Sequence, residues 1–370
     1  MEAQKLFSVL HQFSLRGNVE EIAGFGSGLI NDTYQVKMTG AQLPGYVLQR
    51  INHRVFKNIE ALMDNTIKIT AHLNQKLKGE GGSKAFRQVL QIIPTKDGGT
   101  FYKDGAGNYW RMTEYIKGAK SYDMVQNPMQ AYSSGWAFGK FHHLLSDMDP
   151  KQIEEVIPDF HHIGMRLERF EKALIQDNNG RAVRLQNEIA WVRKRSKQML
   201  RVLELAEEGK LPLRILHYDP KFNNILLDDK DQILCIIDLD TVMPGYLAYD
   251  FGDAVRTIIN RAPEDEADLE KIKLNLPLFE AYTRGYFEGS GSLLEAEEVN
   301  SLILGVLLLP YMQAVRFLTD YLEGDHYYKI MHPEHNLQRT HAQMRLVQEL
   351  EAHQHLLMDT IKKHSQKNHS

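Results

Sequence analysis

The sequence predicts an α+β protein in two parts, an antiparallel-sheet part over residues 1–116 and a mainly helical part over residues 117–370. In the first part, short apolar stretches alternate with turn signals at residues 97–99 and 104–108, which are typical of β-hairpins. After residue 260, apolar residues recur at helical spacing over 274–287, 293–322 and 337–361. A chain of 370 residues is long enough to bury a core in each of two lobes.

The first part begins with an expected short helix over residues 4–16. Three glycines, Gly24, Gly26 and Gly28, then separate two short strands. Glycine permits close backbone approach and a positive φ, so backbone amides can face phosphate oxygens. The stretch is either an ordinary turn or, through Gly26, Ser27 and Gly28, a nucleotide-binding loop.

Further strands and one helix complete the first part. A strand is expected over residues 46–51 and a helix over residues 58–77, with Asn58 as its N-cap. Three more strands are expected over 89–93, 100–102 and 108–113. The segment 113–118 then links the two parts.

The second part is expected to begin with a buried helix over residues 128–148, on which Gly135 and Gly139 would let another element approach closely. The adjacent histidines His142 and His143 point to different helix faces and have no ligand set beside them, so no metal site is expected there. Residues 187–208 predict a helix whose mixed charges indicate a solvated face.

The segment over residues 215–253 carries the side chains that best suit catalysis. Asp219 follows His217 by two residues and precedes Asn224 by five, and Asp238 ends a later apolar run. Two short strands joined by turn residues predict a hairpin that returns Asp238 to the loop of Asp219 and Asn224.

That arrangement suits phosphoryl transfer, in which a base holds the acceptor hydroxyl while Mg²⁺, bound by an Asp and an Asn, bridges the phosphates. We therefore predict Asp219 as the catalytic base. Asn224 and Asp238 are the predicted metal ligands, and Asp240 is an alternative ligand two residues further on.

The order His217-x-Asp219-x-x-x-x-Asn224, followed by Ile237-Asp238, resembles the motif of the aminoglycoside phosphotransferase and choline kinase superfamily. The resemblance implies a protein-kinase-like, two-lobed fold with ATP and Mg²⁺. A longer string over residues 237–245 is similar to the N-acetylhexosamine 1-kinase branch of that superfamily.

The resemblance assigns the nucleotide to the first lobe. Arg50 stands where the family has a phosphate-binding Lys, and Arg can hold phosphate in a bidentate fork; the alternative is a solvent-exposed arginine. Glu60 would pair with Arg50, although the helix dipole alone also favours an acid there. Backbone groups of Glu114 and Ile116 would contact adenine.

The resemblance assigns the acceptor to Asp219 and to the C-terminal helices. In this branch, a segment that resembles residues 315–322 contacts the sugar, and the contact residue corresponds to Arg316. Thr241 lies in another matching stretch and is a second candidate for a sugar contact. The alternative for Arg316 is a surface pair with Asp320 at i, i+4. In kinase-like folds, the residue at the position of Asp250 accepts hydrogen bonds from the backbone of the catalytic loop.

Composition excludes several classes of protein. With 43% hydrophobic and 25% charged residues the chain is typical of a globular protein, and its net charge of −4 gives no basic field for nucleic acid or an anionic membrane. One cysteine, Cys235, allows no internal disulfide and is expected to be buried. The apolar run 302–312, interrupted by Pro310, is expected to be a core helix and not a membrane span. The N-terminal residues do not have the pattern of a signal peptide, so we expect a cytoplasmic protein.

Together these features predict an ATP- and Mg²⁺-dependent kinase that phosphorylates the anomeric hydroxyl of an N-acetylhexosamine. A kinase for choline, homoserine or an aminoglycoside is an alternative. A second alternative is an inactive kinase-like regulator that binds nucleotide or sugar, which the missing Lys favours and the intact Asp219, Asn224 and Asp238 oppose. The sequence predicts no oligomeric state.

Overall fold

The computed structural model describes residues 2–26, 30–40, 43, 45–79, 88–260 and 262–367. The chain divides into two compact units. The first unit comprises Met1–Ser121, Asp147–Pro158 and Asn224–Met243, and the second comprises Tyr122–Ser146, Asp159–Asn223 and Pro244–Ser370. The predicted division after residue 116 therefore lies near the end of the first segment, but it omits two later segments that belong to the first unit.

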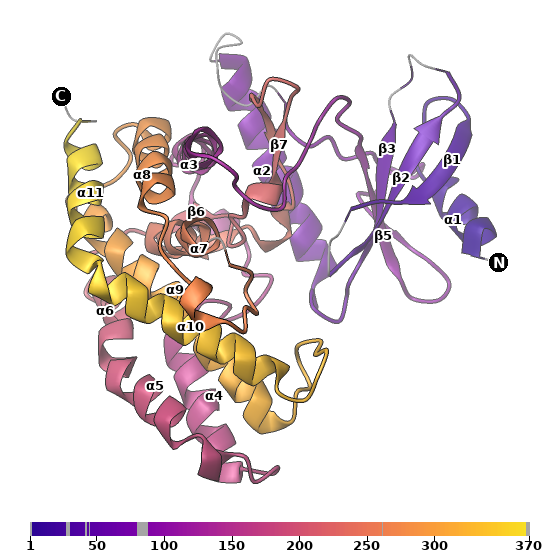
Figure 1. Ribbon diagram of the computed structural model, residues 1–370. Helices are drawn as coiled ribbons and strands as arrows, with labels where there is room; N and C mark the ends of the chain where they lie inside the picture. The colour runs from indigo at the N-terminus through magenta and orange to yellow at the C-terminus, as the bar shows by residue number, and fades with distance from the viewer. Residues whose placement is uncertain are drawn as a thin grey trace. The chain divides into compact units, whose positions relative to one another are not determined.

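The first unit contains a five-stranded antiparallel sheet in the order β1-β2-β3-β5-β4 (Figure 1). Its strands are β1 (Val19–Gly24), β2 (Asp32–Met38), β3 (Tyr46–Ile51), β4 (Tyr102–Lys103) and β5 (Tyr109–Glu114). Helix α1 (Glu2–Leu10) buries Leu6, Val9 and Leu10 against sheet residues that include Leu48 and Trp110. The expected strand over residues 89–93 is wrong, because this segment forms only a single bridge, between Ile92 and Thr113.

The other elements of the first unit are α2 (Ile59–Gly79), β7 (Ile225–Leu227) and β8 (Ile233–Ile236). Asn58 caps α2 as predicted, since its side-chain oxygen accepts the amide of Ala61 at 3.0 Å. Strands β7 and β8 form the predicted antiparallel hairpin. Cys235 is buried in β8, and burial raises the pKa of its thiol to about 12, so it acts as a small apolar residue.

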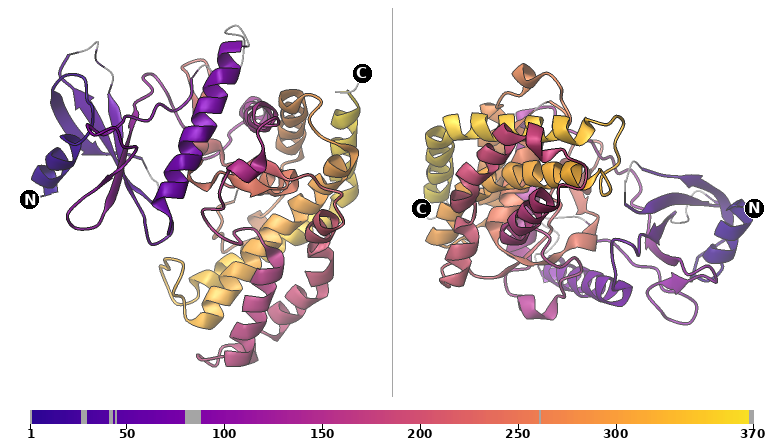
Figure 2. Two further views of the ribbon diagram at one scale, coloured as in Figure 1. Left: turned by 180° about the vertical axis from the view of Figure 1, so that it is seen from behind. Right: turned by 90° about the horizontal axis from the view of Figure 1, so that it is seen from below.

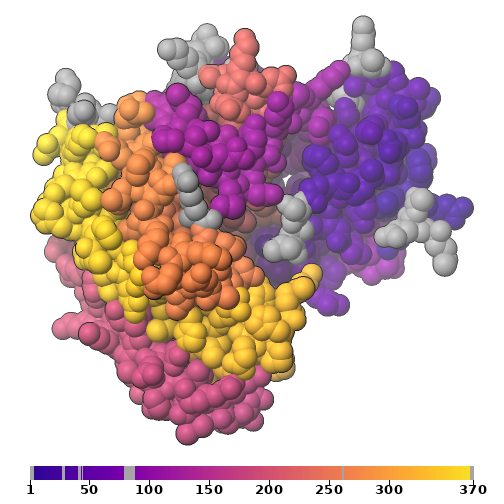
Figure 3. Space-filling model, viewed as in Figure 1, coloured from indigo at the N-terminus to yellow at the C-terminus, as the bar shows by residue number. Residues whose placement is uncertain are grey.

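The second unit is mainly helical, and parts of its surface are formed by α4, α5, α10 and α11 (Figure 3). Its helices are α3 (Pro128–Leu144), α4 (Ile163–Gln176), α5 (Gln186–Met199), α6 (Arg201–Glu207), α7 (Leu247–Ile259), α8 (Leu276–Ser290), α9 (Ala296–Glu323), α10 (His335–Ala352) and α11 (Gln354–Lys367). Two short strands, β6 (Arg214–Leu216) and β9 (Met243–Gly245), flank the catalytic segment in the sequence.

Helices α3 and α8 approach each other through glycines. A Cβ added at Gly135 or Gly139 would collide with backbone carbonyls of α8, and one added at Gly285 or Gly289 would collide with carbonyls of α3. The close approach predicted for Gly135 and Gly139 is confirmed. It fixes α3, which carries His142, against the core of this unit.

The central helix of the second unit is α9, which packs against α4, α7 and α10 (Figures 1 and 2). Among the described residues, α9 is the one helix that is both long enough and apolar enough to cross a membrane. Its most apolar stretch has a mean hydropathy of 1.7, but 83% of that stretch is buried inside the protein. The helix runs through Pro310, so the expected interruption is wrong. Dense packing on several sides stabilises the helix although proline removes one backbone hydrogen bond.

Candidate active site

The catalytic loop follows β6 and is held by Asp250 of α7. One carboxylate oxygen of Asp250 accepts the amide of His217 at 2.7 Å, and the other accepts the amide of Tyr218 at 2.8 Å. Nε2 of His142 lies 2.9 Å from the same carboxylate. The predicted structural role of Asp250 is confirmed. These bonds hold Tyr218 with φ of 63°, one residue before Asp219.

We expect Asp250→Asn to lower the free energy of unfolding by about 1–3 kcal/mol at pH 7, because buried donors lose a charged acceptor. Burial opposes ionisation of Asp250, but the hydrogen bond from His142, the nearby histidines and the amide of His217 together hold its pKa below the ordinary value. The stabilisation is therefore present above about pH 4 and declines as the pH falls through the lower pKa of the folded state. Urea unfolding of wild type and variant at pH 7 and pH 3 measures both effects.

The matched control is Asp359→Asn on α11, whose carboxylate is 57% exposed and pairs with His355. It should change stability by less than about 0.5 kcal/mol. Equal stability of Asp250→Asn and wild type at pH 7 would contradict the role of Asp250 in holding the loop.

Asp219 lies in a tight turn of the second unit. The amide of Lys221 donates to the backbone oxygen of Asp219 at 2.8 Å, and Lys221 Nζ lies 2.9 Å from Asp219 Oδ2. The Asp219 carboxylate remains 26% exposed, so a ligand can reach it. Lys221 was not predicted from the sequence, although a cation two residues after a proposed base is placed to stabilise charge on a transferred group.

Asn224 and Asp238 are brought together by the β7–β8 hairpin of the first unit. Ile225 pairs with Ile236, and the backbone oxygen of Asn224 accepts the amide of Ile237 at 2.9 Å, so Asn224 lies opposite the residue before Asp238. Asp238 adopts a left-handed conformation, with φ of 60° and ψ of 54°. Such a backbone is strained for a non-glycine residue and is concentrated at functional sites.

The donor set of this hairpin suits Mg²⁺, which prefers oxygen ligands and is commonly held by one or two carboxylates together with substrate phosphates. Within the described ranges, no group of three or more His, Cys, Asp or Glu side chains could hold a metal ion by itself. Asn224 and Asp238 thus fit a metal that completes its coordination with a nucleotide.

Asp240 is buried and both of its carboxylate oxygens are engaged. Oδ1 forms an ion pair with Arg111 of β5, and Oδ2 accepts a hydrogen bond from Asn31 at 2.7 Å. Arg111 Nε donates to Gln49 of β3 at 3.0 Å. The carboxylate therefore links the sheet to the short 3-10 turn Leu239–Thr241 that follows Asp238.

The comparisons with known proteins identify the family of the chain. The phosphotransferase enzyme family (APH) matches residues 21–287, more than half of the chain. The chain belongs to this family. Together with the solved kinases below, the match makes it a small-molecule phosphotransferase of the aminoglycoside phosphotransferase and choline kinase type.

Several solved kinases have a fold similar to that of this chain. A microcompartment-associated aminopropanol kinase is 17% identical with a TM-score of 0.63, over 95% of this chain and 98% of that one. A choline kinase from Cryptosporidium parvum is 14% identical with a TM-score of 0.62, over 97% and 99%. An amicoumacin kinase solved with AMP-PNP and Ca²⁺ is 12% identical with a TM-score of 0.60, over 94% of each chain. The protein-kinase-like fold, a sheet-containing first part and a helical second part, is confirmed.

The nucleotide side of this phosphotransferase differs from the prediction at Arg50. Arg50 Nε lies 2.6 Å from Asp32, its cross-strand partner on β2, and both side chains are largely exposed. Glu60 is exposed on α2, and in the part of the chain that the structure describes it forms no ion pair with Arg50. The predicted Arg50–Glu60 pair is therefore wrong. Side chains alternate between the two faces of β3, so Gln49 lies on the same face of the sheet as Arg111 and Arg50 lies on the opposite face.

The remaining predicted nucleotide contacts are placed in part. Gly26 follows β1 with φ of 79°, a conformation that glycine adopts readily, whereas Ser27 and Gly28 lie outside the described residues. Glu114 ends β5, and Ile116 packs in an apolar cluster with Leu234 and Cys235 of β8. Their contacts with adenine stay predictions.

The two predicted sugar contacts belong to different units. Thr241 is buried in the 3-10 turn of the first unit, and Arg316 lies on α9 in the second. Arg316 donates to Gln313 at 2.7 Å, while Asp320 accepts backbone amides of the following loop. In the described part of the chain, Arg316 and Asp320 do not form an ion pair, so the alternative prediction of a surface pair is wrong.

Proposed function

We propose that the protein is an ATP- and Mg²⁺-dependent kinase that phosphorylates a sugar hydroxyl, the anomeric hydroxyl of an N-acetylhexosamine. The observation that carries the proposal is the order Asp219, Asn224, Asp238, with Asn224 paired beside Asp238 and Asp250 holding the loop of Asp219. The sugar class is supported by the similarity of residues 237–245 to the N-acetylhexosamine 1-kinase branch.

In the proposed reaction, Asp219 orients the acceptor hydroxyl and accepts its proton as the hydroxyl oxygen attacks the γ-phosphorus. The bond between that phosphorus and the oxygen bridging to ADP breaks, so the products are a sugar phosphate and ADP. Lys221, beside Asp219, would stabilise negative charge on the transferred group.

Asn224 and Asp238 would hold the metal. Mg²⁺ held by these two side chains would supply the positive charge that phosphoryl transfer needs. The solved amicoumacin kinase, which contains AMP-PNP and Ca²⁺, supports an ATP co-substrate and a divalent ion in this chain as well. Gly26 and the backbone of Glu114 and Ile116 would contact the nucleotide.

The test is a turnover assay with Mg-ATP and a panel of acceptors. N-acetylglucosamine, N-acetylgalactosamine, glucose, galactose, choline, homoserine, 1-amino-2-propanol and kanamycin would each be assayed by ADP release, with the phosphorylated position assigned by ³¹P NMR. We expect the N-acetylhexosamines to be phosphorylated at the 1-position. Phosphorylation of choline or kanamycin alone would overturn the sugar assignment, and ATP binding without turnover on any acceptor would favour the regulatory alternative.

A further inference from the structure

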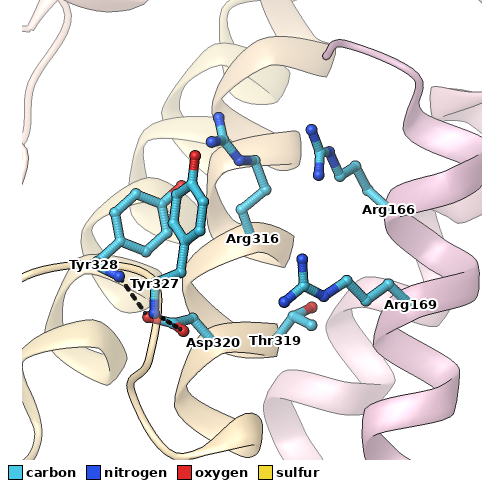
Figure 4. Close-up of a pocket in the computed structure, with 7 residues that line it drawn as sticks. All are labelled: Arg166, Arg169, Arg316, Thr319, Asp320, Tyr327 and Tyr328. Atoms are coloured by element: carbon cyan, nitrogen blue, oxygen red, sulfur yellow. Dashed lines mark hydrogen bonds between the residues drawn. The ribbon is translucent and has the colours of Figure 1, made fainter. Parts of the chain in front are cut away.

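A pocket of the second unit lies between α4 and the C-terminal half of α9 (Figure 4). Arg166 and Arg169 of α4 lie three residues apart on one helix face and extend toward α9, which carries Arg316. The cavity volume is about 30 Å³, room for about two water molecules or one carboxylate group. The pocket is partly open to solvent, so one substituent of a larger ligand can enter it.

Among the described residues that line the pocket, Asp320 is the acidic one, and the fold already uses it. Asp320 accepts the amides of His326 and Tyr327 on one oxygen, at 3.0 and 2.8 Å. Its other oxygen accepts the amide of Tyr328 and the side-chain amide of Asn336, at 3.0 and 2.8 Å. Asp320 thus shapes the loop between α9 and α10 (Figure 4), and each of its oxygens is hydrogen-bonded by this loop or by Asn336.

One of the three arginines has its own counter-charge. Arg169 forms a bidentate pair with Glu323, with Nε 2.9 Å from Oε1 and Nη2 2.5 Å from Oε2. A fork of this kind matches a carboxylate on both of its nitrogens. The positive charge of Arg169 is therefore balanced within the protein.

Arg316 and Arg166 donate hydrogen bonds to neutral groups and not to a carboxylate in the described part of the chain. Arg316 donates to the neutral Gln313, and its guanidinium lies 5.6 to 5.9 Å from the ring centres of Phe160, Tyr327 and Tyr328. Arg166 donates to the backbone oxygens of Asp159 and Phe160, at 3.3 and 2.9 Å.

Within the described part of the chain, neither Arg166 nor Arg316 forms an ion pair, and the buried Nε of Arg166 has no acceptor. Burial and the nearby charge of Arg316 lower the pKa of Arg166. The two guanidinium groups thus repel each other in a pocket of carboxylate size, and a bound anion would relieve that repulsion.

The pocket is also connected to the catalytic loop. The ring of Phe160 lies 5.8 Å from the guanidinium of Arg316 and 6.0 Å from the ring of Tyr218. Tyr218 directly precedes Asp219. One aromatic side chain therefore lies between Arg316 and the residue that precedes the proposed base.

We propose that Arg166 and Arg316 bind the carboxylate of an acidic sugar, so that the preferred acceptor is a hexuronic acid or its N-acetylated amino derivative. This inference rests on the proposed sugar kinase activity and narrows its substrate class. Neutral N-acetylhexosamines would be bound through the same hydroxyl contacts but without the charged one. The carboxylate would accept hydrogen bonds from both guanidinium groups.

The test compares acids with their neutral counterparts. Turnover of glucuronate against glucose, and of galacturonate against galactose, is measured with Mg-ATP at constant ionic strength for wild type, Arg316→Gln and Arg166→Gln. In wild type we expect kcat/KM to be at least about 10-fold higher for each acid. A charged hydrogen bond of this kind corresponds to about 10–100-fold, so each variant should lower the ratio of kcat/KM for an acid to that for its neutral counterpart by that factor.

Two controls separate the pocket from general effects. Arg193→Gln removes an exposed arginine of α5 that pairs with Glu171, and it should not change the preference for acids. Circular dichroism melting of each variant checks folding; if Arg166→Gln does not fold, Arg316→Gln decides. An equal kcat/KM for acids and neutral sugars in wild type, or an unchanged preference in a folded variant, would overturn the inference while leaving the kinase proposal intact.

Ligand-induced stabilisation decides the case in which no acceptor is turned over. The melting temperature of wild type is then measured with glucuronate, with glucose and with sodium sulfate at equal ionic strength. A rise with glucuronate alone that Arg316→Gln abolishes would support the carboxylate pocket although the kinase proposal fails. An equal rise with sulfate, or no rise with glucuronate, would overturn the assignment of the pocket to an acidic acceptor.

Discussion

Replacing Asp219 by asparagine is expected to lower kcat by about 10²–10⁴-fold, the contribution typical of a positioned general base. The substitution keeps the size and shape of the side chain and removes its capacity to accept the proton of the acceptor hydroxyl. Nucleotide binding should remain within about threefold of wild type, because the backbone of the loop is held by Asp250 and not by the Asp219 carboxylate. Steady-state kinetics and equilibrium binding of Mg-ADP measure the two quantities separately.

The matched control is Asp229→Asn in the turn between β7 and β8. Its carboxylate is 81% exposed and pairs with Lys120 at 2.9 Å, so kcat should stay close to the wild-type value. If Asp219→Asn turns over the preferred acceptor as fast as wild type, Asp219 is not the base. A parallel loss of Mg-ADP binding in Asp219→Asn would instead indicate that Asp219 acts on the nucleotide.

The segment that carries the predicted catalytic residues could be predicted because its structure depends on residues that are close together in the sequence. Asp219, Asn224 and Asp238 lie on a strand–loop–hairpin segment in which sequence spacing fixes which residues pair, and the β7–β8 register bears this out. The role of Asp250 followed from the kinase-like order of motifs. The partnership of His142 with Asp250 could not be predicted, because α3 and α7 are distant in sequence and meet only in the packed unit.

The buried ion pair between Arg111 and Asp240 in the first unit was not predicted, for a similar reason. The strand 46–51 was predicted correctly, but Arg50, which was predicted to contact phosphate, pairs with the exposed Asp32, and the register places Gln49 opposite Arg111. Alternation along β5 provided a signal: Trp110 and Met112 join the core under α1, which leaves Arg111 on the other face. What no single strand could show is that Asp240, more than a hundred residues later, lies against that face.

We expect Arg111→Ala to lower the free energy of unfolding by about 3–5 kcal/mol, because it leaves the Asp240 carboxylate buried without its counter-charge. The side chains of Arg111 and Asp240 are 6% and 3% exposed, so water cannot replace the lost partner. Replacing both residues together, as Arg111→Met with Asp240→Leu, should restore most of that stability, since a buried pair of charges can be exchanged for apolar groups at little cost. Urea unfolding of the two single variants and the double variant gives the coupling free energy.

The exposed pair on the same sheet provides the control. Arg50→Ala removes a partner of Asp32 where both side chains are in contact with solvent, at 42% and 50% exposure, and it should cost less than about 1 kcal/mol. The same variants decide between two roles of Asp240. If its main role is to pair with Arg111, Asp240→Asn destabilises the protein and leaves the Mg²⁺ dependence of nucleotide binding unchanged. If Asp240 is instead a metal ligand, that variant folds with nearly wild-type stability and loses the Mg²⁺ dependence. Because Arg111 and Asn31 occupy both carboxylate oxygens, we expect the first result, with Asp238 and Asn224 left as the metal ligands.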